Sequence, residues 1–351
     1  MGGDQQPSAP VAGAIAALQA RADLEVLLVG QPDAVAAAVA AAGMPSGLAR
    51  RCTTVPAAEV IATGESPARA VMAKPQSSIS VGLRLCKAGE ADGFVSAGNT
   101  GALTVGSVLL WERIPGVERP AMPAIVPTVD GRGLVFLDVG AGTEASARNL
   151  LDFALMGSLY AERARGISAP RVALLNVGTE EQKGTAAAKE AFALLQAAPL
   201  RFVGNIEGRD LFADRADVVV TNGFVGNIVL KIIEGFGLGL SQVLGRELRH
   251  SGLRTLLGAA LAAPTLRGLR RRLDPAEVGG VPFLGVGGVC LKCHGSSGSR
   301  ALRNGVLAAA AVAEGGVVAE IGRALAALEA ARPAGRPMAA PGGAEEAKAG
   351  A

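Results

Sequence analysis

The stretch Asp217-Val218-Val219-Val220-Thr221-Asn222-Gly223-Phe224-Val225-Gly226-Asn227 joins an apolar run to a helical pattern over Ile228–Leu240. The apolar run is typical of a buried parallel strand. The segment Thr221–Asn227 is therefore expected to be a strand-to-helix turn at the carboxyl end of a strand, where open α/β sheets bind ligands. Its glycines allow close backbone approach, and a helix start presents free N–H groups to an anion. Taken alone, the turn favours a simpler interpretation, in which Asn and Gly serve only the local geometry.

Strands alternate with helices along most of the chain. Leu24–Val29 is a predicted strand that precedes the helix Asp33–Ala42, and the strand Leu134–Val139 precedes the helix Leu150–Arg163. Strands that alternate with helices of about 10–15 residues favour a parallel sheet covered on both faces. The expected fold class is therefore α/β. After residue 330, Ala, Pro, Gly and Glu dominate, so disorder is expected there.

The composition argues against several classes of protein. Aromatic residues make up 3% of the 351 residues and the net charge is +3, which argues against nucleic-acid binding. No uninterrupted apolar run reaches about 18 residues, so no membrane-spanning helix is expected. The first basic residue is Arg21, after the apolar segment Val11–Leu18, which argues against a secretory signal. The four cysteines are then expected to be reduced thiols in a cytoplasmic protein.

Two further polar turns follow predicted strands. The turn Ala97-Gly98-Asn99-Thr100-Gly101 precedes the helix Ala102–Trp111. Its glycines are three apart with Asn-Thr between them, so it is neither a dinucleotide-binding fingerprint nor a Walker A loop. A generic anion-binding turn is indicated. The other turn, Gly178–Gly184, follows the predicted strand Val172–Val177 and contains Lys183.

The segment His250–Leu273 is basic and amphipathic, and no acidic residue lies within it. Such a segment can lie on an anionic membrane surface or receive an acidic partner. A solvated helical hairpin whose arginines extend along its surface explains the pattern equally well. The residues that form the pattern, together with Arg249 just before the segment, are Arg249, Leu253, Arg254, Leu256, Leu257, Leu261, Leu266, Arg267, Arg270, Arg271 and Arg272.

The sequence Cys290-Leu291-Lys292-Cys293-His294 matches the pattern for c-type haem attachment. Haem attachment normally requires export, for which no signal is seen. A zinc site would need more ligands than this segment offers, and the only other histidine is His250. A redox pair would be expected to open a helix after a strand. We favour the interpretation that Lys292-Cys293-His294-Gly295-Ser296 is a substrate turn and that its cysteines are merely small and semi-buried.

Taken together, these turns resemble one family, the bacterial phosphate acyltransferases of phospholipid synthesis. Members of that family make acyl phosphate from acyl-acyl-carrier protein and inorganic phosphate. Each motif is short, but their order and spacing are specific, and the similarity extends from Met1 to about residue 312. The matching segments are Ser96–Ala102, Leu137–Ala141, Phe153–Gly157, Gly204–Asp210, Asn222–Asn227, Lys292 and His294–Ser297.

The resemblance implies a three-layer α/β/α fold like that of isocitrate and isopropylmalate dehydrogenases, with a mostly parallel sheet. It implies one catalytic domain over residues 1–330, with a helical hairpin protruding over about 228–275, and leaves a tail at 331–351. No cofactor or metal is implied. The implied assembly is a homodimer joined through long helices. It also implies peripheral attachment to the inner face of the membrane, beside a membrane glycerol-phosphate acyltransferase.

Three features depart from the family pattern. Members usually begin with an apolar strand before Met-Gly-Gly-Asp, whereas this sequence starts at that Met1. We therefore expect an in-frame coding sequence for such a strand directly upstream. After Asp138-Val139-Gly140-Ala141 the family continues with Asn and then Asp-Cys-Lys, where this chain has Gly142 and Glu144-Ala145-Ser146, so no function is carried over to those positions. Cys293 stands where Ala is common in the family.

The implied chemistry is attack of phosphate on a thioester carbonyl. The transition state carries negative charge on both the incoming phosphate and the developing oxyanion, so fixed donors in a water-poor cleft give the largest aid. The resemblance assigns catalysis to Lys183, which can hold phosphate as a point charge, and to Asn227, which can bond the oxyanion. A thiolate leaves readily, its ordinary pKa being about 8.5, so no obligate general acid and no covalent enzyme intermediate is expected. His294 either assists or is structural.

The remaining site residues follow from the same comparison of motifs. Those expected to bind phosphate or substrate are Asp4, Gly98, Asn99, Thr100, Gly101, Asn222, Gly223, Phe224, Gly226, His294, Gly295 and Ser296. Those expected to contact the membrane or the acidic acyl-carrier protein are Arg249, Arg254, Leu256, Leu257, Arg267, Arg270 and Arg271. The sequence does not separate these two roles of the arginines.

Other functions stay open at this point. A short-chain phosphate acetyl- or butyryltransferase that uses acyl-coenzyme A shares the fold class. A haem or redox carrier built on Cys290 and Cys293 is a non-enzymatic alternative, and a membrane-surface scaffold is another.

Overall fold

The structure is a computed structural model that describes residues 1–250, 252, 255, 258, 261–265, 268 and 275–331. Five strands form its largest sheet, in the order β4-β5-β8-β6-β7. β5, β8, β6 and β7 are parallel, whereas β4 runs antiparallel to β5. The strands are β4 (Ala124–Val126), β5 (Leu134–Leu137), β6 (Arg171–Leu175), β7 (Arg201–Ile206) and β8 (Val218–Val220).

The other described strands form two smaller sheets, so the expected sheet is divided. One has the order β3-β10-β9, with β3 parallel to β10, and the other pairs β1 with β2. Ala121 and Leu284 exchange two backbone hydrogen bonds of 2.9 Å, which join the three-stranded sheet to the chain entering β4. These strands are β1 (Val26–Gly30), β2 (Cys52–Pro56), β3 (Phe94–Ser96), β9 (Val281–Pro282) and β10 (Cys290–Lys292).

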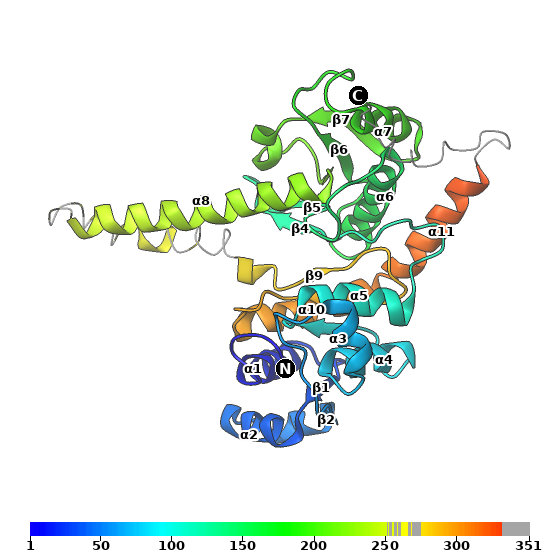
Figure 1. The fold of residues 1–351 in the computed structure, drawn as a ribbon. Helices are drawn as coiled ribbons and strands as arrows, with labels where there is room; N and C mark the ends of the chain where they lie inside the picture. Colours follow the sequence, from blue (N-terminus) through cyan, green and yellow to red (C-terminus); the bar gives the residue numbers. More distant parts are fainter. Residues whose placement is uncertain are drawn as a thin grey trace, which may run out of the picture.

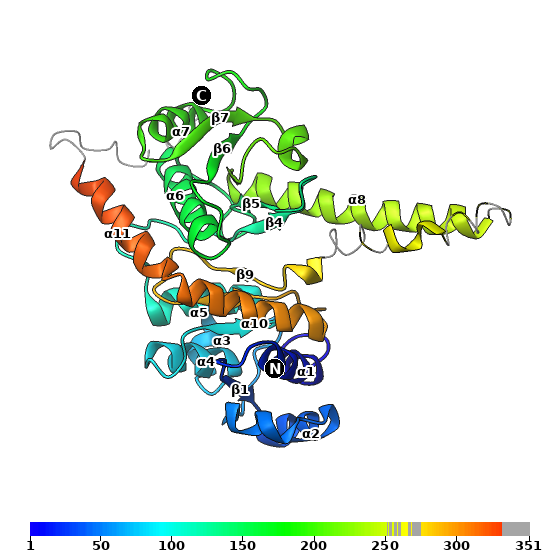
Figure 2. The same ribbon diagram turned by 180° about the vertical axis from the view of Figure 1, so that it is seen from behind.

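Helices cover the sheets as the alternating pattern predicts (Figure 1). α6 (Ala147–Arg163) and α7 (Ala186–Ala197) pack beside the five-stranded sheet, and their apolar side chains share its largest core. Figure 2 shows α10 (Ser299–Glu314) along the smaller sheets, next to α1 (Ser8–Ala20). Further described helices are α2 (Pro32–Ala42), α3 (Pro67–Ala73), α4 (Ser78–Lys87), α5 (Thr100–Trp111) and α11 (Val317–Ala330). Short 3₁₀-helices span Ser46–Arg51, Gly208–Phe212 and Pro275–Glu277.

The long helix α8 (Gly223–His250) projects away from the body of the molecule (Figure 1). It begins at Gly223, so Gly223–Asn227 form its first turns instead of a loop before a helix at Ile228. By length and composition α8 could cross a membrane, since its most apolar 18-residue window has a mean hydropathy of 1.5. From the sequence no membrane-spanning helix was expected, because only uninterrupted apolar runs were counted. The window in α8 is interrupted by glycines and charged residues. None of that window is buried.

The cysteines near residue 290 are packed inside the protein. Cys290 and Cys293 are both 0% exposed and belong to different apolar clusters, Cys290 with Ile79 and Leu83, Cys293 with Leu302. Burial raises the pKa of the Cys293 thiol to about 11 and that of Cys290 further. The interpretation as small packed side chains is therefore favoured over a redox pair, with full burial in place of the expected partial burial.

Candidate anion-binding edge of the five-stranded sheet

The carboxyl ends of four parallel strands meet at one edge of the five-stranded sheet. In the register of the sheet, Val220 of β8 lies beside Leu137 of β5 on one side and Leu174 of β6 on the other. The loops that follow these strands are therefore neighbours. The Asn205 side chain at the end of β7 donates to the Glu180 carbonyl at 2.9 Å and ties a fourth strand to the same edge. This is the edge at which such sheets bind ligands.

Asp138 organises the loop after β5. Its carboxylate is 1% exposed and accepts four backbone N–H groups. Oδ1 accepts from Met122 at 2.9 Å, Gly140 at 3.1 Å and Ala141 at 3.0 Å, and Oδ2 accepts from Gly142 at 2.9 Å. Both oxygens are thus committed to shaping the loop, so Asp138 is not a free base. The sequence signal for this role is an Asp directly after an apolar strand and before a glycine-rich turn.

The first turn of α8 lies directly against this loop, and its glycines permit the contact. A Cβ at Gly226 would lie 1.9 Å from the Asp138 carbonyl oxygen, and one at Gly223 would lie 1.9 Å from the Gly142 carbonyl oxygen. Asn222 caps the helix, because its Oδ1 accepts from the Val225 N–H at 2.9 Å. Gly223 and Gly226 therefore fix where the positive end of the helix lies.

A cavity of about 400 Å³ opens between the Asp138 loop and the start of α8. Its lining residues are Thr143, Glu144, Ala145, Asn222 and Phe224. Asn222 and Phe224 were expected to bind substrate, whereas Thr143, Glu144 and Ala145 lie where the sequence departs from the family pattern and were not assigned a role. The positive end of α8 lies beside this cavity, whereas Glu144 places a carboxylate in its lining.

Lys183 and Asn227 lie at the same edge of the sheet, Lys183 in the loop after β6 and Asn227 in the first turns of α8, which follows the neighbouring strand β8. Both side chains are exposed. In the described part of the chain, no carboxylate lies within ion-pairing distance of Lys183 and no hydrogen bond engages the Asn227 amide. The Asn176 side chain donates to the Lys183 carbonyl at 3.0 Å and holds the backbone of the lysine loop. Both groups are therefore available to a ligand.

The other expected binding residues gather at the carboxyl ends of β3 and β10. The backbone N–H of Asp4 donates to the Gly295 carbonyl at 2.9 Å, and a Cβ at Gly2 would lie 3.2 Å from Gly98 Cα. His294 is exposed, and its Nδ1 lies 2.8 Å from Ser296 Oγ. Residues Met1–Asp4, Ser96–Gly101 and Lys292–Ser296 thus form a second cluster on a different sheet.

Within this second cluster, Asn99 has a structural task. Its Oδ1 accepts from the Ala102 N–H at 3.0 Å and caps α5, while its Nδ2 donates to the carbonyls of Ala62 at 3.0 Å and Thr63 at 3.2 Å. Thr100 and Gly101 form the first turn of α5. The amide of Asn99 is therefore committed to the protein, and the N–H groups at the start of α5 are what the turn offers to an anion.

Lys292 belongs to the second cluster but was not given a site role. Its Nζ donates to the Cys293 carbonyl, and burial lowers the pKa of its amine. The residues expected to bind phosphate or substrate thus lie in two clusters, at the ends of strands that belong to different sheets. No hydrogen bond among the described residues joins the cluster around Lys183 and Asn227 to the cluster around Asp4, Gly98 and His294.

Of the residues expected to contact membrane or carrier protein, Arg249 is exposed in the last turn of α8. The others lie outside the described residues, namely Arg254, Leu256, Leu257, Arg267, Arg270 and Arg271.

The fold and the exposed lysine beside a helix start define an α/β/α protein with an edge suited to an anion. Solved structures share this fold. A phosphotransacetylase from Streptococcus pyogenes matches with a TM-score of 0.59 at 16% identity, over 87% of this chain and 92% of that one. A branched-chain phosphotransacylase from Enterococcus faecalis matches with a TM-score of 0.54 at 14% identity, over 89% and 96%. At such identities the likeness establishes the fold alone, and it confirms the α/β/α prediction.

The chain belongs to the family described as "Fatty acid synthesis protein", which matches residues 1–320. The phosphate acyltransferase of Heliobacterium modesticaldum is 51% identical over 304 residues, covering 87% of this chain and 89% of that protein. The phosphate acyltransferase of Myxococcus xanthus is 45% identical over 325 residues, covering 92% and 91%. The resemblance drawn from the motifs is confirmed.

Proposed function

We propose that this protein is an acyltransferase that moves a fatty acyl group from a thioester to inorganic phosphate and so supplies acyl phosphate for phospholipid synthesis. The observation that carries the proposal is the exposed Lys183, which has no ion pair among the described residues and lies at the same sheet edge as the start of α8 and its cavity. The relatives at 51% and 45% identity are named for acyl transfer to phosphate, which supports the same reaction.

In the proposed reaction, a phosphate oxygen attacks the thioester carbon. A bond forms between that carbon and the phosphate oxygen, the carbon–sulfur bond breaks, and the sulfur leaves as a thiolate. The Lys183 ammonium holds the phosphate as a point charge. The Asn227 amide donates to the oxyanion that develops on the carbonyl, and the N–H groups at the start of α8 add partial positive charge. The Asn227 amide and the start of α8 thus stabilise the charge that grows on the carbonyl oxygen, whereas Lys183 binds and positions the charged phosphate.

We propose acyl-acyl-carrier protein as the thioester donor. Acyl-carrier protein is acidic, and the basic segment that starts at Arg249 offers charge complementarity. The alternative donor is acyl-coenzyme A, as in a short-chain phosphate acyltransferase. Phosphate-dependent thiol release measured with both donors at matched concentrations is expected to be at least about tenfold faster with the carrier protein. Equal or faster turnover of acyl-coenzyme A would contradict this choice of donor and leave the transfer to phosphate intact.

We also propose a homodimer joined through α8, attached to the inner face of the membrane beside a glycerol-phosphate acyltransferase. The support is the apolar surface of α8, where Ile232 is 63% exposed and Phe236 is 71% exposed. Free apolar surface of this extent on one helix is typical of an interface.

The variant Phe236→Asp tests the dimer. It is expected to shift the protein from dimer to monomer in light scattering, because a charge would be buried between the helices. Met72→Asp is the control, since Met72 is equally exposed on α3, at 77%. A wild-type monomer would contradict the dimer. Failure of the wild type to sediment with anionic vesicles would contradict membrane attachment.

A further inference from the structure

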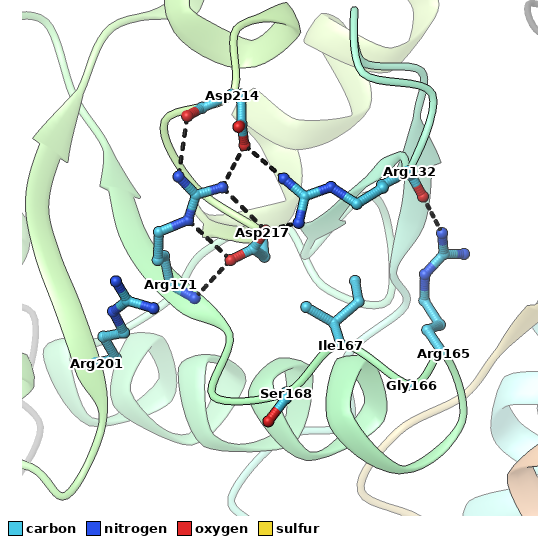
Figure 3. Close-up of a pocket in the computed structure, with 9 residues that line it drawn as sticks. All are labelled: Arg132, Arg165, Gly166, Ile167, Ser168, Arg171, Arg201, Asp214 and Asp217. Atoms are coloured by element: carbon cyan, nitrogen blue, oxygen red, sulfur yellow. Dashed lines mark hydrogen bonds and ion pairs between the residues drawn. The ribbon is translucent and has the colours of Figure 1, made fainter.

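A second cavity, of about 720 Å³, opens at the amino edge of the five-stranded sheet, opposite to the edge that carries Lys183 (Figure 3). Its walls come from the first residues of β6 and β7 and from the loops that precede β5, β6 and β8. A cavity of this volume suits a molecule of metabolite size. The charged residues that line it are Arg132, Arg165, Arg171, Arg201, Asp214 and Asp217.

Two of the arginines are already paired with the two aspartates. Arg171 donates from Nε to Asp217 at 3.0 Å and from a terminal nitrogen to Asp214. Arg132 donates to Asp214 at 2.9 Å and also pairs with Asp130. The hydrogen bonds that Arg171 donates to Asp217 and Asp214 raise the pKa of its guanidinium group. In this network the positive charges of the two arginines are largely cancelled by the negative charges of the two aspartates.

The other two arginines have no such compensation. No carboxylate lies within ion-pairing distance of Arg165 or Arg201 in the part of the chain that the structure describes. Arg165 donates to the Arg132 carbonyl at 2.6 Å and also interacts with the buried Tyr160 hydroxyl. Arg201 is exposed at the start of β7. Figure 3 shows Arg201 on the side of Arg171 and Arg165 on the opposite side, beyond Ile167.

We propose that this cavity binds a small dianion whose two phosphate or carboxylate groups are held by Arg165 on one side and Arg201 on the other. Four arginines and two aspartates leave the lining with a formal charge of +2, from four minus two. A guanidinium group presents its N–H donors as a planar fork that matches an oxyanion. Neither Arg165 nor Arg201 is neutralised by a carboxylate among the described residues, and the two groups of the ligand would supply the missing negative charge. The proposed ligand therefore matches both the charge and the placement of these two arginines.

The test is calorimetric titration of the full-length protein with inorganic pyrophosphate. Wild type is expected to bind one pyrophosphate per chain, and Arg201→Ala is expected to raise the dissociation constant roughly tenfold or more. Arg165→Lys keeps the positive charge but loses the planar set of N–H donors of the guanidinium group, so it is expected to weaken pyrophosphate binding as well. Arg50→Ala removes an exposed arginine elsewhere and is expected to leave the dissociation constant unchanged. Lys183→Ala is expected to leave it unchanged too, which separates this cavity from the proposed phosphate site.

Three results would overturn the proposal. The first is the absence of pyrophosphate binding to wild type. The second is binding that is lost in Lys183→Ala but kept in Arg201→Ala, which would place the anion at the other edge of the sheet. The third is a protein that ignores pyrophosphate yet binds an acidic carrier protein through Arg201, which would make the cavity part of a protein-docking surface. Melting temperatures equal to that of wild type show that the variants are folded.

Discussion

Replacing Lys183 by alanine is expected to lower the rate of acyl-phosphate formation by roughly a hundred- to a thousandfold without lowering the melting temperature. The Lys183 side chain is exposed and forms no ion pair among the described residues, so its removal leaves no buried partner unsatisfied. The loop keeps its hydrogen bonds, because Asn176 and Asn205 bind carbonyl groups of the backbone. The maximal rate is expected to fall and the half-saturating phosphate concentration to rise, because the positive charge that holds the phosphate is missing.

Asn227→Ala is expected to reduce the rate by a similar factor, but with little change in the half-saturating phosphate concentration, since its amide is assigned to the oxyanion. Lys189→Ala is the matched control, because Lys189 is also exposed and follows the same loop in α7. The measurement is phosphate-dependent release of thiol from acyl-acyl-carrier protein. Wild-type rates in Lys183→Ala and Asn227→Ala would contradict the catalytic roles proposed for both residues.

Gly226→Ala is expected to destabilise the protein by about 3 kcal/mol and to abolish most of the activity. The added Cβ would lie 1.9 Å from the Asp138 carbonyl oxygen, and a backbone atom of a loop held by four hydrogen bonds cannot move aside easily. The start of α8 must therefore shift away from the loop. That shift also moves Asn222 and Asn227, which stand on either side of Gly226.

Gly237→Ala serves as the control within the same helix. Among the described residues, nothing lies within 4 Å of a Cβ at Gly237, so alanine is expected to raise stability by up to about 1 kcal/mol through its higher helix propensity. Urea unfolding of the two variants and wild type gives the comparison. Equal stability of Gly226→Ala and wild type would show that α8 and the Asp138 loop are not in the close contact described.

Local sequence signals located many elements well. Gly43 ends α2 in the left-handed conformation, at φ 64°, as a C-terminal glycine is expected to do. The start of α8 was placed five residues late, because two glycines weaken the helical pattern, whereas Asn222 is itself a capping signal. The segment Leu48–Val55 predicts a strand, and its second half does form β2, whereas Leu48 and the three residues after it belong to the 3₁₀-helix Ser46–Arg51. Arg51 holds that segment by donating to the carbonyls of Leu18, Arg21 and Leu24, contacts that no local pattern encodes.

The sequence by itself determined the fold class, the family and the chemistry expected of Lys183 and Asn227, because these depend on local periodicity and on motifs read in order along the chain. Only the tertiary structure decided how the glycine- and asparagine-rich turns are grouped. The order of strands in a sheet is set by pairing between distant segments, and this pairing places the turns of Gly98 and His294 on one sheet and those of Lys183 and Asn227 on another. The same long-range contact gives Gly223 and Gly226 their role, since the carbonyl groups they approach belong to residues some eighty positions earlier.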